Sequence, residues 1–555
     1  MRYIFLFILL FINYELISQN IETQLRERGE AYVSFNISDV ISKQIDFSAL
    51  SFDKITDDKV YFYLSLDNYE NTLTKDVNYR LEEIPSKLNK IEMASSLEAF
   101  SYFWDKYPTY QQYDSLMHKF QTNFPNLCKL ENIGTLASGR EILAVKLGDN
   151  VNTDENEVKF FYTSTMHGDE VTGYVMMLRL IDYLLTNYSS DSEVQYLMNN
   201  VEIWINPLAN PDGTYHSGNN TVFGATRYNA NAVDLNRNYP DPEDGPHPDG
   251  KVYQPETVFF MNLADSVKFN ISANFHGGQE VVNYPWDTWS KLSADDDWWK
   301  IVSKRFADTA QANSPSGYME MFGTGYTNGY QWYSVWGGRQ DYMNYYQHCR
   351  EVTIEISNNK TISESLLDAH WGYLKPSLLN YISDATHGIT GHITDSITGF
   401  AVKSKIEILN HDIDSSCVYS NDSAFYFRPI NTGVYDIKYS ADGYFPKIIH
   451  NVHLYIDSLV NLDVELVSGY DAINDYSGMI KLSVFPNPIN SDALFIKSNI
   501  SFDYIEIVDL LGKQFYNEKV NSKLLKLNIR NYPKGVYIVR VSLKDGVISK
   551  KLIIQ

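Results

Sequence analysis

The sequence predicts an α/β fold, a mixed sheet sandwiched by helices, followed by two small all-β sandwich domains. Between about residues 102 and 385, apolar strand-like segments alternate with amphipathic helical ones, as in a sheet that helices cover. After residue 387 the pattern changes to short strands separated by turn signals. The chain of 555 residues also exceeds what one hydrophobic core usually organises, so we expect three or more domains.

The N-terminus has the features of a signal peptide, assigned to residues 1–19. One basic residue, Arg2, precedes a short apolar run from Ile4 to Ile12, and polar residues follow. No later segment reaches the roughly 18 to 20 continuous apolar residues of a membrane-spanning helix. We therefore expect an exported protein without a transmembrane segment.

Charge and cysteine content narrow the class of protein further. Forty-six basic and sixty-nine acidic residues give a net charge of -23, which disfavours binding to nucleic acid or to an anionic membrane. The excess of acid would attract a cationic peptide, or it could simply keep an exported protein in solution. Cys128, Cys349 and Cys417 are too few and too widely spaced for a disulfide framework or a cysteine zinc site, although one disulfide remains possible.

The segment before the central domain mixes short alternating stretches, Ala31 to Ile37 and Val60 to Leu66, with charged helical ones. This predicts a small α/β unit at residues 20–101, which is either a prosegment or a permanent N-terminal domain. The other predicted parts are the central domain at 102–385, a β-sandwich at 386–467, a linker at 468–481 and a second β unit at 482–555.

Three apolar runs in the central domain end in polar motifs. Val158 to Thr165 leads into His-Gly-Asp-Glu, after which residues 171–188 have helical periodicity. Residues 201–205 end in Asn-Pro-Leu-Ala-Asn-Pro-Asp-Gly, and residues 269–275 end in His276. Active sites of open α/β sheets gather at the carboxyl ends of strands, so these motifs are candidates for one site.

His167, Glu170 and His276 are the candidate ligands of one Zn²⁺. A catalytic zinc takes three protein ligands and keeps one position open, and imidazoles and carboxylates are suitable ligands. His-x-x-Glu alone is expected by chance in a chain with twelve histidines, so the prediction depends on the combination of motifs. Asp234 is either a carboxylate that accepts the second N–H of a ligating histidine or a simple turn or cap residue.

The order and spacing of these motifs resemble the M14 family of zinc carboxypeptidases, and within it the carboxypeptidase N/E subfamily, over about residues 102–467. His167-Gly-Asp-Glu170, Asn210-Pro-Asp-Gly213 and His276-Gly-Gly match the family pattern. The resemblance implies the zinc carboxypeptidase fold, a zinc ion bound by the three candidate ligands, and hydrolysis of the C-terminal peptide bond of a peptide or protein.

The same resemblance implies roles for residues around the metal. Arg227 would polarise the scissile carbonyl and hold its developing negative charge, unless it is a surface arginine. Asn236 and Arg237 would bind the free carboxylate of the substrate. Tyr333, in the segment Gln331–Gly338, resembles the mobile tyrosine that closes over the bound terminus, with a core tyrosine as the alternative.

A general base is also implied. Glu355, in Val352-Thr-Ile-Glu-Ile-Ser357, alternates with apolar residues of a predicted strand. By the resemblance it takes a proton from the attacking water and later delivers one to the leaving amine. Glu351, four positions earlier, is the competing candidate.

Asp287 lies where the subfamily has a carboxylate that pairs with a substrate Lys or Arg, and Gln340 resembles the glutamine that assists it. Arg339 stands where the subfamily usually has methionine, which would oppose a basic substrate if its side chain entered the pocket. Neighbouring residues on a strand face opposite ways, so we expect Arg339 to point outward. Broader or apolar specificity is the alternative.

The C-terminal parts resemble two known modules. Residues 386–467 resemble the transthyretin-like β-sandwich of the subfamily. Residues 482–555 resemble the type A sorting domain of the type IX secretion system, with Phe485-Pro-Asn-Pro, Asp-Leu-Leu-Gly512 and Tyr532-Pro-Lys-Gly-Val-Tyr. This implies contact with the secretion machinery and a location outside the cell or on the outer-membrane surface.

Two other functions stay open. A zinc amidase or peptidoglycan-peptide hydrolase on the same fold would replace the groups that bind the C-terminal carboxylate. An inactive peptide-binding surface protein would be expected to lack a ligand or Glu355.

Overall fold

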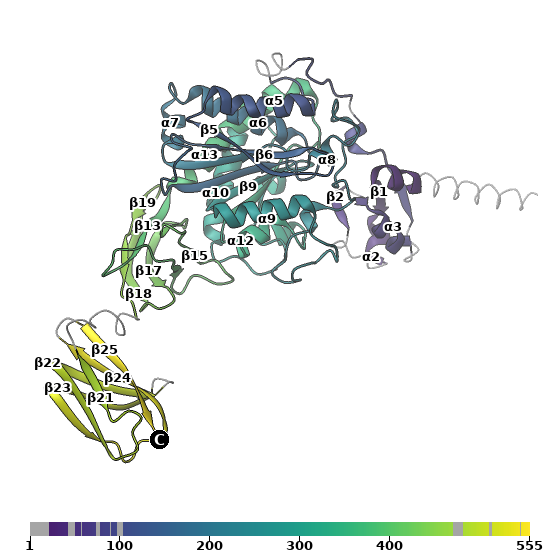
Figure 1. Cartoon of the computed structure of the whole chain (residues 1–555). Helices are drawn as coiled ribbons and strands as arrows, with labels where there is room; N and C mark the ends of the chain where they lie inside the picture. Colours follow the sequence, from purple (N-terminus) through teal and green to yellow (C-terminus); the bar gives the residue numbers. More distant parts are fainter. Residues whose placement is uncertain are drawn as a thin grey trace, which may run out of the picture. The chain divides into compact units, whose positions relative to one another are not determined.

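A computed structural model describes residues 21–42, 50–56, 58–73, 78–88, 90–96, 104–469, 481–509, 513–543 and 546–555 (Figure 1). The predicted signal peptide, most of the predicted linker and the end of the Asp-Leu-Leu-Gly motif lie outside these ranges. The described residues up to Gly391 form one compact unit with 407–437 and 450–462, and the remaining residues form a second. The N-terminal and central segments therefore belong to the same unit.

The N-terminal segment forms a four-stranded antiparallel sheet in the order β2-β3-β1-β4. Two of its strands correspond to the alternating stretches that the sequence predicted near residues 31–37 and 60–66. Its elements are β1 (Ala31–Asn36), α2 (Ile37–Ser42), β2 (Ser51–Ile55), β3 (Lys59–Leu64), α3 (Leu66–Leu73) and β4 (Tyr79–Leu81).

An eight-stranded mixed sheet forms the middle of the central domain, in the order β11-β10-β12-β9-β7-β8-β6-β5. The four strands β8, β7, β9 and β12 run parallel, whereas β6 and β10 pair with them in the antiparallel sense. The bounds are β5 (Cys128–Thr135), β6 (Glu141–Leu147), β7 (Val158–Ser164), β8 (Val201–Asn206), β9 (Ile271–His276), β10 (Glu280–Tyr284), β11 (Tyr326–Asn328) and β12 (Arg350–Ile356).

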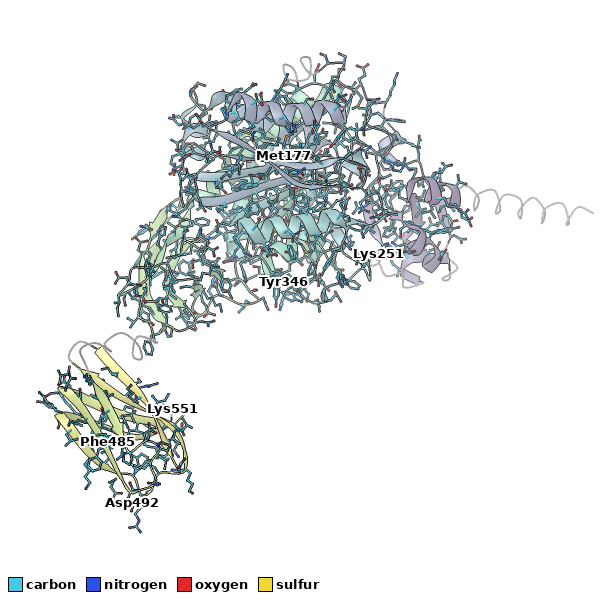
Figure 2. The ribbon with its side chains drawn as sticks, viewed as in Figure 1. Met177, Lys251, Tyr346, Phe485, Asp492 and Lys551 are labelled. Atoms are coloured by element: carbon cyan, nitrogen blue, oxygen red, sulfur yellow. The ribbon has the colours of Figure 1, made fainter. Side chains whose placement is uncertain are left out.

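Helices cover both faces of this sheet (Figure 1), which explains why its parallel strands are apolar at successive positions. Phe160 and Tyr162 of β7 join the core under one helical layer, while Phe161 joins the core under the other. Figure 2 labels Met177 on α6 and Tyr346 at the end of α12, on opposite sides of the sheet. The first layer is α5 (Tyr110–Asn123), α6 (Thr172–Asn187), α7 (Ser192–Met198), α10 (Asp296–Ala312) and α13 (Leu367–Ser383), and the second is α9 (Pro255–Val267) and α12 (Arg339–Tyr345).

All-β regions follow, so the predicted fold class is confirmed. Two four-stranded sheets come first, one made by β16, β13, β19 and β20 and the other in the order β15-β14-β17-β18; the last sheet contains β21 to β25. The bounds are β13 (Gly388–Asp395), β14 (Lys405–Ile408), β15 (Val418–Tyr419), β16 (Phe425–Arg428), β17 (Gly433–Ser440), β18 (Lys447–Leu454), β19 (Leu459–Asn461), β20 (Val464–Leu466), β21 (Leu482–Phe485), β22 (Ala493–Asp509), β23 (Gln514–Asn528), β24 (Gly535–Leu543) and β25 (Gly546–Ile554).

Within the described ranges, no helix is long and apolar enough to cross a membrane. Cys128 and Cys349 are buried free thiols, and Cys417 is also buried. Neither Cys128 nor Cys349 therefore takes part in the disulfide that the sequence left open.

A buried ion network joins β16 to the start of α10. The guanidinium of Arg428 donates to Asp295 over 2.9 and 3.1 Å and to Asp412 over 2.6 Å, and Arg350 donates to the same Asp295 over 3.0 Å. Burial acts to raise the pKa of Asp295, but Arg428 and Arg350 hold it below its usual value. Because Arg428 is completely buried, its removal would leave Asp412 without its guanidinium partner and Asp295 with Arg350 alone.

Arg428→Ala is therefore expected to lower the free energy of unfolding by about 3–5 kcal/mol, the usual loss when one partner of a buried ion pair is removed. Urea unfolding followed by tryptophan fluorescence measures this loss. Lys300→Ala is the matched control, since Lys300 forms a half-exposed ion pair with Asp296 on α10 and should change stability by less than about 1 kcal/mol. Equal effects of the two substitutions would contradict the structural role of Arg428.

Candidate metal centre and substrate cleft

The polar motifs meet because they follow neighbouring parallel strands. β9 pairs with β7 on one side and with β12 on the other, and His276 at the end of β9 lies opposite Glu355 of β12 in the strand register. His167 and Glu170 lie in the turn between β7 and α6. The strand order therefore brings residues separated by nearly 200 positions to one edge of the sheet.

His167, Glu170 and His276 form a buried cluster whose ligand atoms all lie within 4.8 Å of one another. The Nδ1 atoms of the two histidines are 3.1 Å apart, and each lies within 3.0 Å of a Glu170 carboxylate oxygen. Two imidazoles and one carboxylate that converge in this way could hold a metal ion, and they form a donor set that zinc accepts. The three predicted ligands are thus placed together.

Each histidine has a polar partner on its other ring nitrogen. Nε2 of His167 lies 3.1 Å from Asp234 Oδ1, and Nε2 of His276 lies 2.8 Å from the Asn274 side-chain amide. Asp234 also caps the turn that follows it, accepting from the backbone N–H of Asn236, so its carboxylate contacts His167 and caps a turn at the same time. If His276 binds a metal through Nδ1, its Nε2–H needs an acceptor. The buried Oδ1 of Asn274 has no partner, and rotating this amide by half a turn would place that oxygen next to Nε2. The surroundings fit two histidines that are held as metal ligands.

The Asn-Pro-Asp-Gly motif supports the turn that carries His167 and Glu170. The side chain of Asn210 donates to the carbonyl of Met166 and accepts from the N–H of Gly213, over 3.2 and 2.8 Å. A Cβ atom on Gly168 would lie only 2.5 Å from the backbone of Gly213, so this close approach requires glycine. The motif therefore fixes the backbone between His167 and Glu170.

Arg227 lies beside the proposed ligands and is only 4% exposed, so it is not a surface arginine. Its Nε donates to Asp234 Oδ2 over 3.0 Å, and its Nη1 donates to Glu170 Oε1 over 3.4 Å. The guanidinium is thus a fixed cation at the edge of the cluster.

Of the two candidate bases, only Glu355 lies next to the cluster. It lines a cavity together with the three ligands, and its Oε2 has no hydrogen-bond partner. Burial and the charge of Glu170 raise its pKa well above the ordinary value for glutamate. Glu351 is fully buried away from this cavity, where its carboxylate accepts from Arg339 and Ser272 over 3.0 and 2.7 Å.

The residues predicted to bind the substrate carboxylate lie in two cavities. Asn236 and Tyr333 line the small cavity of about 20 Å³ that contains the proposed ligands and Glu355. The Asn236 Oδ1 accepts from the N–H of Arg339 over 3.0 Å, which leaves its NH₂ group as a donor. Arg237 instead lines a neighbouring cavity of about 270 Å³, where its buried Nε has no partner. The structure does not place Arg237 in the same cavity as Asn236.

Asp287 also lines the small cavity and is held by two amides. The side chains of Asn283 and Gln340 both donate to its Oδ1 over 3.0 Å. A Cβ atom on Gly329 would lie 1.8 Å from this oxygen, so glycine leaves the space that the carboxyl occupies. Burial raises the pKa of Asp287 to about 7. The carboxyl is thus fixed in orientation and titrates near neutral pH.

The expectation that Arg339 lies on a strand was wrong. It is the first residue of α12, and its side chain is buried. Its guanidinium donates to Glu351 over 3.0 Å and lies 5.1 Å from the ring centre of Phe161. Strand alternation does not apply at a helix start, but the side chain still points away from Asp287 and puts no positive charge into that pocket.

Three residues in the cleft, Lys360, Asp53 and Phe52, were not predicted. Lys360 Nζ lies 2.6 Å from Glu170 Oε1 and 3.2 Å from Asp53 Oδ1. Asp53 and Phe52 come from β2 of the N-terminal sheet and line the small cavity. Lys360 follows Glu355 by five positions, which is a weak signal, whereas nothing in the local sequence of β2 indicates a place in the cleft.

Comparisons with known proteins agree with this geometry. A family model described as "Zinc carboxypeptidase" matches residues 113–379. The catalytic chain of carboxypeptidase N from Rattus norvegicus is 30% identical over 383 residues, which cover 61% of this chain and 82% of that relative. The chain belongs to the zinc carboxypeptidase family. The predicted family resemblance is therefore confirmed.

Other relatives of this zinc carboxypeptidase family member are longer. Carboxypeptidase D from Mus musculus is 33% identical over 377 residues, which are 65% of this chain but only 27% of that protein, so the chain spans about a quarter of it. The crystal structure of carboxypeptidase A from Helicoverpa armigera has a TM-score of 0.48 and 18% identity, covering 64% of this chain and 98% of that one. A second family model, "Secretion system C-terminal sorting domain", matches residues 483–555 and confirms the predicted sorting domain.

Proposed function

We propose that this chain is a secreted zinc carboxypeptidase that removes single residues from the C-termini of peptides, with a preference for Lys or Arg. The observation that supports this most is the buried cluster of His167, Glu170 and His276 beside Glu355 and Arg227 in one cavity. Export agrees with the C-terminal sorting domain, for which the secretion machinery is the proposed partner.

The cluster would hold one zinc ion, which would act as a Lewis acid and lower the pKa of a water molecule. Glu355 would take the proton from the attacking water, because its Oε2 is uncommitted and lies in the same cavity. It would then deliver that proton to the leaving amine. One carboxyl thus serves first as base and then as acid.

Arg227 would stabilise the negative charge that develops on the scissile carbonyl oxygen. Its contacts with the carboxylates of Asp234 and Glu170 fix the guanidinium in place, so it would need little rearrangement to meet a further anion. The NH₂ group of Asn236 and the uncommitted Nε of Arg237 would bind the substrate carboxylate. These donors explain why the terminal bond, rather than an internal one, would be cleaved.

The preference for Lys or Arg is proposed from Asp287. Its carboxyl is buried at the cavity wall and oriented by Asn283 and Gln340, and Arg339 is turned away from it. A buried anion in a specificity pocket favours a cationic side chain and disfavours an anionic one.

If the proposed function is correct, hydrolysis requires both zinc and a free carboxylate at the C-terminus of the substrate. On N-blocked dipeptides that end in Arg, Lys, Phe or Asp, we expect turnover of the Arg and Lys substrates, loss of turnover with a zinc chelator, and recovery with added zinc. The C-terminal amide of the Arg substrate should be cleaved at least about 30-fold more slowly, since removal of one partner of a buried charge pair typically costs 2–5 kcal/mol.

Liquid chromatography of the products gives kcat/KM for each substrate. These values measure both the dependence on zinc and the loss of activity on the amide substrate. Cleavage that ignores the chelator would contradict the zinc mechanism. Equal cleavage of the acid and its amide would favour an amidase instead.

A further inference from the structure

The two oxygens of the Asp287 carboxyl have different surroundings. Oδ1 accepts from the side-chain amides of Asn283 and Gln340, each over 3.0 Å, and the backbone of Gly329 packs against it. Among the residues that the structure describes, none donates to Oδ2. Beside Oδ2 stands Gly338, where even an added Cβ atom would make only ordinary contact at 3.7 Å. The carboxyl therefore presents one occupied and one free oxygen.

We propose that this arrangement makes the pocket select C-terminal lysine over arginine, because Asp287 offers a substrate cation one oxygen rather than two. The inference rests on the proposed function and narrows its substrate class. Asn283 and Gln340 then act as specificity-determining residues, since their amides decide which oxygen of Asp287 stays free.

The two basic side chains place different demands on a carboxylate. An ionised carboxylate has about four lone-pair sites, about two on each oxygen, so two amide donors fill Oδ1 of Asp287. A guanidinium binds most strongly through two parallel N–H···O bonds, one to each oxygen. With Oδ1 occupied, arginine loses this fork geometry. An ammonium is a compact charge with three rotatable N–H donors, so one free oxygen suffices for lysine.

The hydrogen-bond network fixes both amides as donors to Asp287. Oε1 of Gln340 accepts from the backbone N–H of Thr353 over 2.7 Å, which leaves the NH₂ group of Gln340 to face Asp287. In Asn283 the reverse orientation would place an amide oxygen against the carboxylate oxygen, and the two would repel each other. Neither amide can therefore turn to release Oδ1 without losing a hydrogen bond.

The backbone of Asp287 is held as well. The carboxylate of Asp341, which is only 1% exposed, accepts from the N–H groups of Asp287 and Thr288 over 3.0 and 2.8 Å. The carbonyl of Asp287 accepts from the N–H of Val335 over 3.2 Å. With its peptide groups and Oδ1 all bonded, the residue cannot present both oxygens to a substrate without breaking several of these bonds.

Asn283 also leaves an acceptor without a partner in the pocket. The residue lines the same cavity as Asp287 and is only 6% exposed, and its buried Oδ1 has no hydrogen-bond partner. A buried acceptor without a partner is unfavourable, so a ligand that supplies a donor is favoured. The rotatable ammonium of lysine can donate to Asp287 with one N–H and still have two N–H groups for other acceptors.

The test compares kcat/KM of the full-length, zinc-loaded protein on N-blocked dipeptides ending in Lys and in Arg. It is done at pH 8, above the pKa of about 7 to which burial raises Asp287. We expect the wild-type protein to prefer Lys by about fivefold or more, roughly the factor that one net hydrogen bond contributes. Both substrates are measured on one sample, so the ratio does not depend on the fraction of folded protein.

Asn283→Ala and Gln340→Met each remove one donor from Oδ1. In both variants the ratio of kcat/KM for Lys and Arg should fall to about one or below, because the guanidinium can then reach both oxygens. Asn313→Ala is the matched control, since Asn313 is exposed at the end of α10 and its amide donates to the carbonyl of Thr309 in the same helix. It should keep the wild-type ratio.

A wild-type protein that cleaves the Arg substrate as well as the Lys substrate would overturn the inference, and so would a ratio that stays unchanged in both variants. Dipeptides ending in norleucine and citrulline, the neutral counterparts, test the proposed function separately. If neither basic substrate exceeds its counterpart, the proposed preference for basic residues fails. If no dipeptide is cleaved at all, the proposed activity fails, and the dissociation constants of free lysine and arginine from titration calorimetry then decide the inference by the same ratio.

Discussion

Glu355→Gln is expected to lower kcat by about 10²- to 10⁴-fold, the usual contribution of a general acid–base group. The amide has nearly the same shape as the carboxyl but cannot accept a proton from the attacking water. Because Glu355 is not one of the three proposed ligands, zinc content should stay at the wild-type value, and KM should change little. Steady-state kinetics together with metal analysis of the same samples measures both quantities.

Glu351→Gln is the matched control on the same strand. Glu351 pairs with Arg339 in the core, so its neutralisation should lower stability by up to several kcal/mol while kcat of the folded protein stays within about twofold of wild type. If Glu355→Gln kept wild-type activity, or if both variants lost it equally, Glu355 would not be the base.

The sequence was sufficient to predict the central sheet and the meeting of the metal motifs. Apolar runs at residues 158–165, 201–205 and 269–275 correspond to β7, β8 and β9 within one or two residues. Parallel strands buried on both faces need apolar residues at nearly every position, which makes such strands easy to detect. Once they are recognised, the rule that sites form at carboxyl ends brings His167 and His276 together.

The composition of the cleft could not be predicted in the same way. The contacts of Asp53 with Lys360 and of Ser51 with Asp234 join residues more than 180 positions apart, and they depend on how the N-terminal sheet docks. No local pattern encodes such docking, because hydrophobic periodicity reports which face of an element is buried and not what covers it.

Arg339 shows a different limit. The sequence suggested a strand, and alternation then predicted an outward side chain, but the segment begins a helix at Gly338-Arg339. The residue that neutralises Arg339 is Glu351, on a neighbouring strand of the sheet and not adjacent in sequence. An ion pair of this kind can be recognised only after the packing of α12 against β12 is known.

Asp287→Asn is expected to abolish the discrimination between a substrate ending in arginine and one ending in citrulline, its neutral isostere. In the wild-type protein the Arg substrate should have a kcat/KM at least about 30-fold higher, since truncating one partner of a buried charge pair typically costs 2–5 kcal/mol. The asparagine keeps the size of the side chain and can still meet Asn283 and Gln340. The two substrates should therefore become equal within about threefold in the variant.

The same preference should depend on pH in the wild-type protein. The pKa of Asp287 is raised to about 7 by burial, so the carboxyl is mostly neutral below that pH and mostly ionised above it. Arginine stays charged throughout this range. The ratio of kcat/KM for the Arg and citrulline substrates should therefore rise between pH 6 and pH 8 in the wild type. Because a single group titrates, this ratio should rise by no more than about tenfold per pH unit. In Asp287→Asn the ratio should be flat; a wild-type ratio that falls over this range would show that a group other than Asp287 selects the basic side chain.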